Sequence, residues 1–175
     1  AITRMRPYAN KLTELLENLS AGLDSSEGGA YAQKREKNNV LLVAITSNRG
    51  LCGAFNSNVI KECLEIAKTS SLEVSFYCIG KKGADILSKT HNVIQTNSEI
   101  FDDLTFENIS KIAEMLMSKY SNKEFNKITI VYNKFKNAAT QIVTNEQYLP
   151  IENSHSEENN ELIDYIFEPS QTEII

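Results

Sequence analysis

The feature that most constrains the fold is Val40 to Thr46, a nearly unbroken apolar segment of strand length. Apolar residues at every position, rather than at alternate positions, indicate a strand covered on both faces, as in a parallel sheet. A polar segment with glycines follows, and from Phe55 to Ala67 the apolar residues recur at helical spacing. The sequence therefore predicts a strand, a glycine-bearing turn and a helix.

This unit recurs in outline further along the chain. Alternating apolar residues from Val74 to Ile79 predict a second strand, Gly80 to Gly83 a second glycine turn, and Val93-Ile94 a brief third strand. The short stretch Ala84 to Leu87 lies between them. Strands that alternate with helices favour an α/β layered domain with right-handed crossovers.

The second half of the chain predicts a long helix and two further strands. Thr105 to Tyr120 has helical periodicity, Ile128 to Tyr132 is a buried strand, and Thr140 to Tyr148 is its extended partner. The apolar residues of this helix that we expect to face inward are Phe106, Ile109, Ile112, Ala113, Leu116 and Tyr120. The fold class expected is a three-layer Rossmann-like α/β domain with a mainly parallel sheet.

The first segment, 2–23, carries apolar residues on one narrow helical seam. They are Met5, Tyr8, Leu12, Leu15 and Leu19. This spacing fits either the cut end of a coiled-coil helix or an ordinary amphipathic helix that begins at Pro7. The polar residues 24–39 predict an exposed connection.

Charge and cysteine usage exclude several classes of function. The net charge is −5, but residues 152–175 hold seven acids and no Lys or Arg, so residues 1–151 carry 18 basic against 16 acidic side chains, or +2. A nearly neutral body gives no general attraction for nucleic acid. No apolar run approaches the roughly 20 residues of a membrane span. Three widely spaced cysteines suit reduced thiols that pack as small hydrophobes.

Neither glycine turn has the spacing of a phosphate-binding loop. Gly50-Leu51-Cys52-Gly53 and Gly80 to Gly83 lack both GxGxxG and GxxxxGK[ST], so tight-turn geometry is the favoured reading of Gly50, Gly53, Gly80 and Gly83. No Cys/His pair has metal-ligand spacing, and His91 and His155 are far apart. We therefore predict no catalytic residue, cofactor or metal. Arg49 stands out because it directly follows a buried strand, where a turn projects it outward.

At Thr46 to Asn56 the chain closely resembles the gamma-subunit family of F-type ATP synthases. Five further motifs resemble the family in the same order: Arg6-Pro7-Tyr8-Ala9, Ile79-Gly80-Lys81-Lys82-Gly83, Val131-Tyr132-Asn133-Lys134-Phe135, Gln147-Tyr148-Leu149-Pro150 and Asp164-Tyr165-Ile166-Phe167-Glu168-Pro169. Two positions depart from the family pattern, because Asn48 stands where an Asp is common and Ala54 where a glycine is usual.

The resemblance implies a central-stalk rotor subunit, without catalysis of its own. It implies the lower part of an N-terminal coiled-coil helix at 1–23, a connecting loop at 24–39, a Rossmann-like domain at 40–169 and the start of a returning antiparallel helix at 170–175. Both long helices would be largely missing from the chain. Its partners would be the epsilon subunit, the c-ring and the alpha and beta subunits, at the cytoplasmic face of the bacterial membrane, with no insertion into it.

The resemblance also implies roles for individual residues. Arg49, with Asn48 beside it, would contact the acidic C-terminal region of a beta subunit, while Gly50, Leu51, Cys52 and Gly53 would hold the turn. Because nucleotides would bind to other subunits, the missing phosphate loop is expected. The alternatives are a small Rossmann-like nucleotide-binding enzyme or module that uses the two glycine turns, and a free-standing adaptor domain.

Overall fold

In this computed structural model, the described residues are 6, 7, 9–12, 15 and 38–151. The chain divides into two compact units, one comprising residues 1–34 and 150–175 and the other residues 35–149. In the first unit, residues 6, 7, 9–12 and 15 have helical backbone. Three residues of the predicted seam (Met5, Tyr8 and Leu19) and the expected returning helix at 170–175 lie outside the described residues. Their pairing as a coiled coil therefore stays a prediction.

The second unit is an α/β domain, and the predicted fold class is confirmed. Its elements, in chain order, are β1 (Asn39–Ile45), α3 (Phe55–Thr69), β2 (Glu73–Ile79), α4 (Lys81–Leu87), β3 (Asn92–Asn97), the 3₁₀ helix η1 (Glu99–Phe101), α5 (Phe106–Ser121), β4 (Lys127–Asn137) and β5 (Thr140–Leu149). The sequence-based domain limits of 40 and 169 differ from the limits of this unit, which are 35 and 149.

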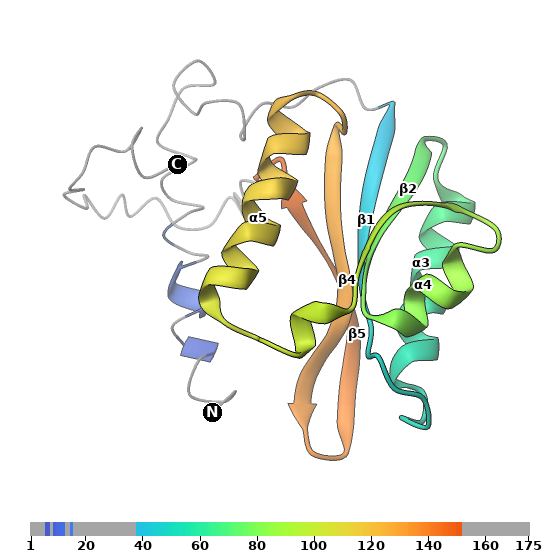
Figure 1. The fold of residues 1–175 in the computed structure, drawn as a ribbon, viewed down its shortest axis with the longest axis vertical. Helices are drawn as coiled ribbons and strands as arrows, with labels where there is room; N and C mark the ends of the chain where they lie inside the picture. Colours follow the sequence, from blue (N-terminus) through green and yellow to red (C-terminus); the bar gives the residue numbers. More distant parts are fainter. Residues whose placement is uncertain (1–5, 8, 13–14, 16–37, 152–175) are drawn as a thin grey trace, which may run out of the picture. The chain divides into compact units, whose positions relative to one another are not determined.

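A single sheet with the strand order β3-β2-β1-β4-β5 organises the domain. β1 pairs in parallel with β2 and β4, β2 pairs in parallel with β3, and β5 closes the sheet as the antiparallel partner of β4. α3 and α4 cover one face and α5 covers the other, which gives three layers (Figure 1). β1 is thus the central strand, and it is buried on both faces, as its unbroken apolar sequence predicts.

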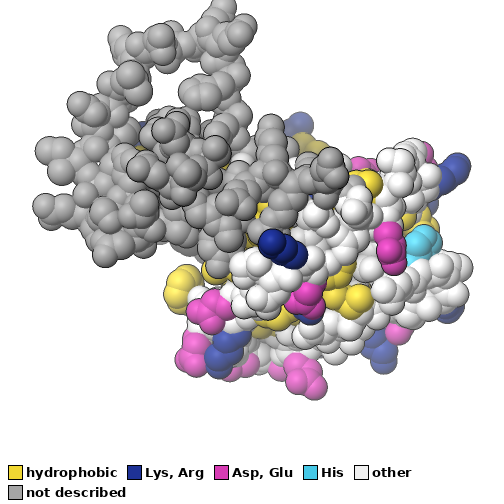
Figure 2. All heavy atoms as spheres, turned by 90° about the horizontal axis from the view of Figure 1, so that it is seen from above, with side chains coloured by type: hydrophobic (Ala, Val, Ile, Leu, Met, Phe, Trp, Pro, Cys, Tyr) yellow, Lys and Arg dark blue, Asp and Glu magenta, His cyan; other side chains and the backbone are white. Residues whose placement is uncertain are grey.

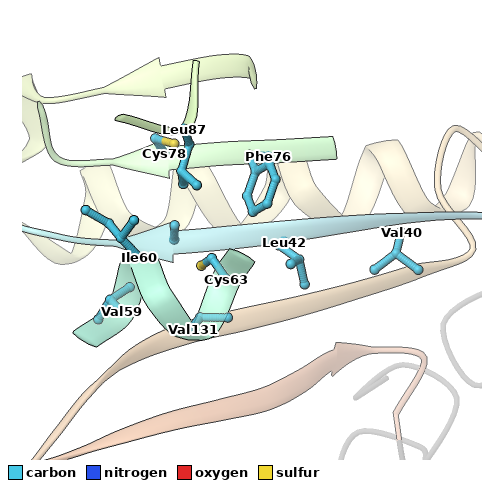
Figure 3. Close-up of a cluster of buried hydrophobic side chains, with 10 residues drawn as sticks. Val40, Leu42, Val59, Ile60, Cys63, Phe76, Cys78, Leu87 and Val131 are labelled. Atoms are coloured by element: carbon cyan, nitrogen blue, oxygen red, sulfur yellow. The ribbon is translucent and has the colours of Figure 1, made fainter. Parts of the chain in front are cut away.

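The main core lies between the sheet and helices α3 and α4 (Figure 3). Its buried members are Val40, Leu42, Ala44, Val59, Ile60, Cys63, Phe76, Cys78, Leu87 and Val131. Alternate residues of β1, such as Leu41 and Val43, are also buried, and they belong to the opposite face of the strand. On the surface seen in Figure 2, basic and acidic side chains lie interspersed rather than gathered by sign.

The inward face predicted for α5 is correct only for its second half. Leu116 and Tyr120 are buried, but Phe106 is 88% exposed and Ile109 is 45% exposed. Thr105 caps the helix by accepting a hydrogen bond from the Asn108 N–H at 3.2 Å, so Phe106 is the first helical residue. Helical periodicity marks an apolar stripe but not how far the sheet extends beneath it, and here the first turn of the stripe faces solvent.

Candidate functional site

The segment of residues 46–54, here called the β1–α3 loop, leaves the carboxyl end of the central strand. β1 is the point at which the strand order reverses, because the chain builds β2 and β3 on one side of it and β4 and β5 on the other. In open α/β sheets, ligands and partners commonly bind at this edge. The loop is therefore the first place to look for a functional site.

Thr46 anchors the loop to the next strand–helix connection. Its side chain is buried, with 1% exposure. The Thr46 N–H donates to the Ile79 carbonyl at 2.8 Å, and Thr46 Oγ1 accepts from the Gly83 N–H at 2.9 Å. The two connections therefore touch through their backbones.

Gly80 makes this close approach possible. Its φ is +100°, and a Cβ built on it would lie 2.0 Å from the Thr46 carbonyl oxygen. Such a φ is rare for residues with a side chain, and no real contact is that short. The sequence-based reading of Gly80 as a turn glycine agrees with this geometry.

The prediction for Gly83 is wrong, because Gly83 lies inside helix α4 rather than in a turn. α4 begins at Lys81, directly after Gly80. Gly80, the residue before the helix, has the positive φ, while Gly83 is the third residue of the helix. Its small size serves packing instead, since a Cβ there would lie 3.1 Å from Thr46 Oγ1.

Asn48 joins three segments of the domain. Its Oδ1 accepts a hydrogen bond from the Lys81 N–H at 3.0 Å, and its Nδ2 donates to the Ser98 carbonyl at 2.7 Å. A carboxamide offers one acceptor and one donor group, and both are used here. An Asp at this position could make only the first bond. The side chain of Asn48 is thus engaged within the fold, while its predicted contact with a partner stays a prediction.

We expect Asn48→Ala to lower the free energy of unfolding by about 1–3 kcal/mol, because each of the two lost hydrogen bonds is worth about 0.5–1.5 kcal/mol net. Asn48→Asp keeps the acceptor for the Lys81 N–H, so it should lower the free energy of unfolding by less than Asn48→Ala does. Urea unfolding of the three chains measures the difference. An alanine variant as stable as the parent chain would show that the amide makes no net contribution.

The backbone carbonyl of Arg49 is held by three side chains. Ser47 Oγ donates to it at 2.7 Å, Asn56 Nδ2 at 3.1 Å and Cys52 Sγ at 3.5 Å. Asn56 Oδ1 also accepts the Ser47 N–H at 2.9 Å, so the start of α3 closes the loop. This ring of polar contacts fixes the backbone from which the exposed Arg49 side chain projects.

Ser47 and Asn56 are the residues of the site that the sequence analysis missed. Both belong to the segment Thr46 to Asn56 that carries the family resemblance. Their place in this segment was the one feature of the sequence that could have identified them as site residues. From β4, Asn133 Nδ2 donates to the Phe55 carbonyl at 2.7 Å and ties the first turn of α3 to the sheet. A second matching segment, 131–135, contains this residue.

The tip of the loop differs from the prediction in its side chains. Leu51 has a φ of +60° and is fully exposed, so its side chain does not pack within the turn. Cys52 is also exposed, against the expectation of a buried small hydrophobe, because its Sγ lies beside the carbonyls of Arg49 and Gly50. Gly53 has a φ of +56°, whereas Gly50 lies in open space apart from the end of Lys82.

The two buried cysteines of the domain lie in its core rather than in the β1–α3 loop. Burial raises the pKa of Cys63 to about 12 and that of Cys78 to about 11, so neither thiol is a thiolate nucleophile near neutral pH. Among the described residues, no group of three or more His, Cys, Asp or Glu side chains could hold a metal ion. No helix in the described part of the chain has the length and apolar character to cross a bilayer.

Comparisons with known proteins agree with the sequence resemblance. The family model described as ATP synthase matches residues 1–175. The chain is 58% identical over 176 residues to the ATP synthase gamma chain of Flavobacterium johnsoniae and 55% identical over 177 residues to that of Christiangramia forsetii. Each match covers 100% of this chain and 62% of the relative, so the chain spans less than two thirds of the relatives' length.

Solved structures show the same fold. One is the Tetrahymena thermophila mitochondrial ATP synthase, central stalk and c-ring, with a TM-score of 0.59 and 25% identity over 86% of this chain and 73% of that chain. Another is the rotor of the Euglena gracilis mitochondrial ATP synthase, with a TM-score of 0.54 and 19% identity over 85% of this chain and 60% of that chain.

Proposed function

Because this chain belongs to the gamma-subunit family of ATP synthases, we propose that it is the globular part of a central-stalk rotor subunit. In this role it performs no catalysis and couples rotation of a membrane c-ring to conformational change in the catalytic beta subunits, with the alpha subunits as further partners. Its location is then peripheral, at the cytoplasmic face of the bacterial membrane, with the epsilon subunit as a further partner. Family membership over the whole chain is the observation that carries the proposal.

The geometry of the β1–α3 loop supports a contact through Arg49 and Leu51. The ring of hydrogen bonds to the Arg49 carbonyl fixes the backbone, while the side chains of Arg49 and Leu51 are both exposed at the tip. A guanidinium suits a carboxylate-bearing partner surface, because it forms paired, charge-assisted hydrogen bonds. The partner surface proposed is the acidic C-terminal region of a beta subunit.

Leu51 adds to this argument because its backbone is unfavourable for a residue with a side chain. A branched residue at a φ of +60° stores strain, and such strain often marks a functional position. Packing within the domain does not offset this strain, because the Leu51 side chain is fully exposed. We infer that Leu51 packs on the partner beside Arg49.

The alternative of a Rossmann-like nucleotide-binding enzyme is not favoured. The two relatives reported above, which match the whole chain, are ATP synthase gamma chains. At the edge where such an enzyme binds phosphate, the Phe55 N–H at the start of α3 already donates to the Cys52 carbonyl at 3.2 Å. Equilibrium dialysis of the chain with ATP separates the two functions, because only the enzyme would give saturable binding.

We expect Arg49→Ala to impair coupling between ATP hydrolysis and ion pumping in the assembled complex. A charge-assisted hydrogen bond contributes about 1.5–3 kcal/mol, or roughly ten-fold or more in the strength of the contact. Arg49→Lys keeps the charge but not the paired geometry and should lose less. The ratio of ions pumped to ATP hydrolysed in membrane vesicles measures the effect.

A matched control is Lys89→Ala, which removes a second exposed cation outside the loop. We expect it to leave coupling unchanged. Normal assembly and normal coupling of the Arg49→Ala complex would contradict the proposed contact.

A further inference from the structure

The edge strand β3 is open to a further strand. It pairs with β2 on one side, and on its other side no strand lies beside it in the part of the chain that the structure describes. Its sequence, Asn-Val-Ile-Gln-Thr-Asn, has no charge and no proline, which are the usual protections of an exposed edge. Asn92, Ile94, Gln95 and Thr96 are all exposed.

The register identifies a backbone group that faces outward. The Asn97 carbonyl accepts the Gly80 N–H at 2.9 Å, so the backbone polar groups of Asn97 point toward β2. Because these groups alternate along a strand, the N–H and carbonyl of Thr96 point to the open edge. The irregularity between Phe76 and Tyr77 precedes this position, and Thr96 itself pairs regularly with Cys78.

A groove of about 450 Å³ lies beside this edge. Its walls come from β2, β3, η1 and α5, with the apolar side chains Ile100, Ile112 and Met115 and the amides Gln95 and Asn97. Tyr77 lies at its floor with 1% exposure, and its hydroxyl has no hydrogen-bond partner of normal geometry among the described residues. Burial raises the pKa of Tyr77, and the nearby Asn97 side chain partly opposes this. The groove thus combines an apolar wall with hydrogen-bonding groups.

The charge at this groove is negative. Glu99 and Asp103 line it, whereas Lys111, the one basic lining residue among those described, is paired with Glu107 at 3.0 Å. Exposed apolar side chains occur in the same segment, since Ile94 is 37% exposed and Leu104 is 65% exposed. A matching partner therefore presents basic and apolar side chains together.

We propose that β3 accepts an extended segment of a partner polypeptide as an additional strand of the sheet. Main-chain groups of the partner pair with Thr96, its apolar side chains lie on the groove, and a Lys or Arg lies near Glu99 and Asp103. In pairing of this kind, main-chain hydrogen bonds provide the affinity, and pockets for alternate side chains provide the specificity. This surface uses no residue of the β1–α3 loop and goes beyond the function proposed above.

A second copy of this chain is a poorer match for the edge. Its own β3 carries no basic side chain to place against Glu99 and Asp103. Complementarity of charge therefore favours a different polypeptide.

The test is a titration of the ¹⁵N-labelled chain with a capped octapeptide that alternates valine and lysine. We expect saturable shifts at Ile94, Thr96 and Glu99, and at least about ten-fold weaker binding of the peptide with glutamate in place of lysine. Thr96→Pro removes an outward N–H but leaves the hydrogen bonds between β3 and β2 intact. It should weaken binding of the lysine peptide about ten-fold, because that is the change in affinity that one backbone hydrogen bond contributes. Thr96→Val keeps the N–H and should bind like the parent chain.

Three results would overturn this inference: no binding, equal binding of the two peptides, or unchanged binding by a folded Thr96→Pro chain. If the parent chain dimerises and Thr96→Pro abolishes the dimer, the added strand comes from a second copy of this chain and not from a different polypeptide. None of these results depends on assembly or on Arg49, so failure here leaves the rotor proposal standing.

Discussion

Gly80→Ala is expected to destabilise the chain by about 2–6 kcal/mol, because two penalties act together. The φ of +100° is a strained conformation for alanine, which costs about 1–3 kcal/mol. The new Cβ would also meet the Thr46 carbonyl oxygen at 2.0 Å, and relieving such overpacking costs about 1–3 kcal/mol more. Since the atom it meets is backbone, β1 or α4 has to move. Urea unfolding followed by circular dichroism measures the loss.

Gly53→Ala is the matched control for this experiment. Gly53 also has a positive φ, +56°, but a Cβ there has nothing within 4 Å. Only the conformational penalty remains, so we expect a loss of about 1 kcal/mol. Equal effects of the two substitutions would show that the close approach of Gly80 to Thr46 does not constrain the fold.

Phe76→Ala is expected to remove about 3–5 kcal/mol, the usual effect of truncating a buried aromatic side chain. Phe76 is fully buried in the cluster between the sheet and α3 and α4 (Figure 3). Its ring also lies edge-on to His91, with the ring centroids 5.4 Å apart. Truncation therefore leaves a cavity and removes an aromatic contact. The same unfolding measurement applies.

Phe106→Ala provides the comparison, because it deletes the same atoms from a side chain that is 88% exposed. We expect a change within about 0.5 kcal/mol. A loss as large as that of Phe76→Ala would mean that Phe106 is buried in solution, as its helical spacing alone predicts.

The sequence predicted the elements better than it predicted their environments. The unbroken apolar run of β1 and the alternation in β2 identify strands because each pattern reports directly on burial. Phe106 fits the apolar stripe of α5 and was predicted to face inward, but it is exposed, because a periodic stripe does not reveal where the underlying sheet ends. Gly80 and Gly83 belong to one GxxG pattern, and only the backbone geometry separates the turn residue from the helical one.

The candidate site was predictable in position but not in construction. Arg49 follows a buried strand, so its projection from the sheet edge could be foreseen. The contacts of Ser47, Asn56 and Asn48 could not, because they depend on how the loop folds back on α3 and on which segments lie beside it. Asn48, for example, lies 50 positions from Ser98, its hydrogen-bond partner.

The central place of β1 has a mechanical consequence. Arg49 lies four residues beyond Ile45, the last residue of a strand that is hydrogen-bonded along both sides to parallel neighbours. A pull on the loop along the strand axis therefore loads both ladders in shear, so many hydrogen bonds resist at once instead of opening one after another. A load applied at the loop tip is spread over β2 and β4 before it can displace β1.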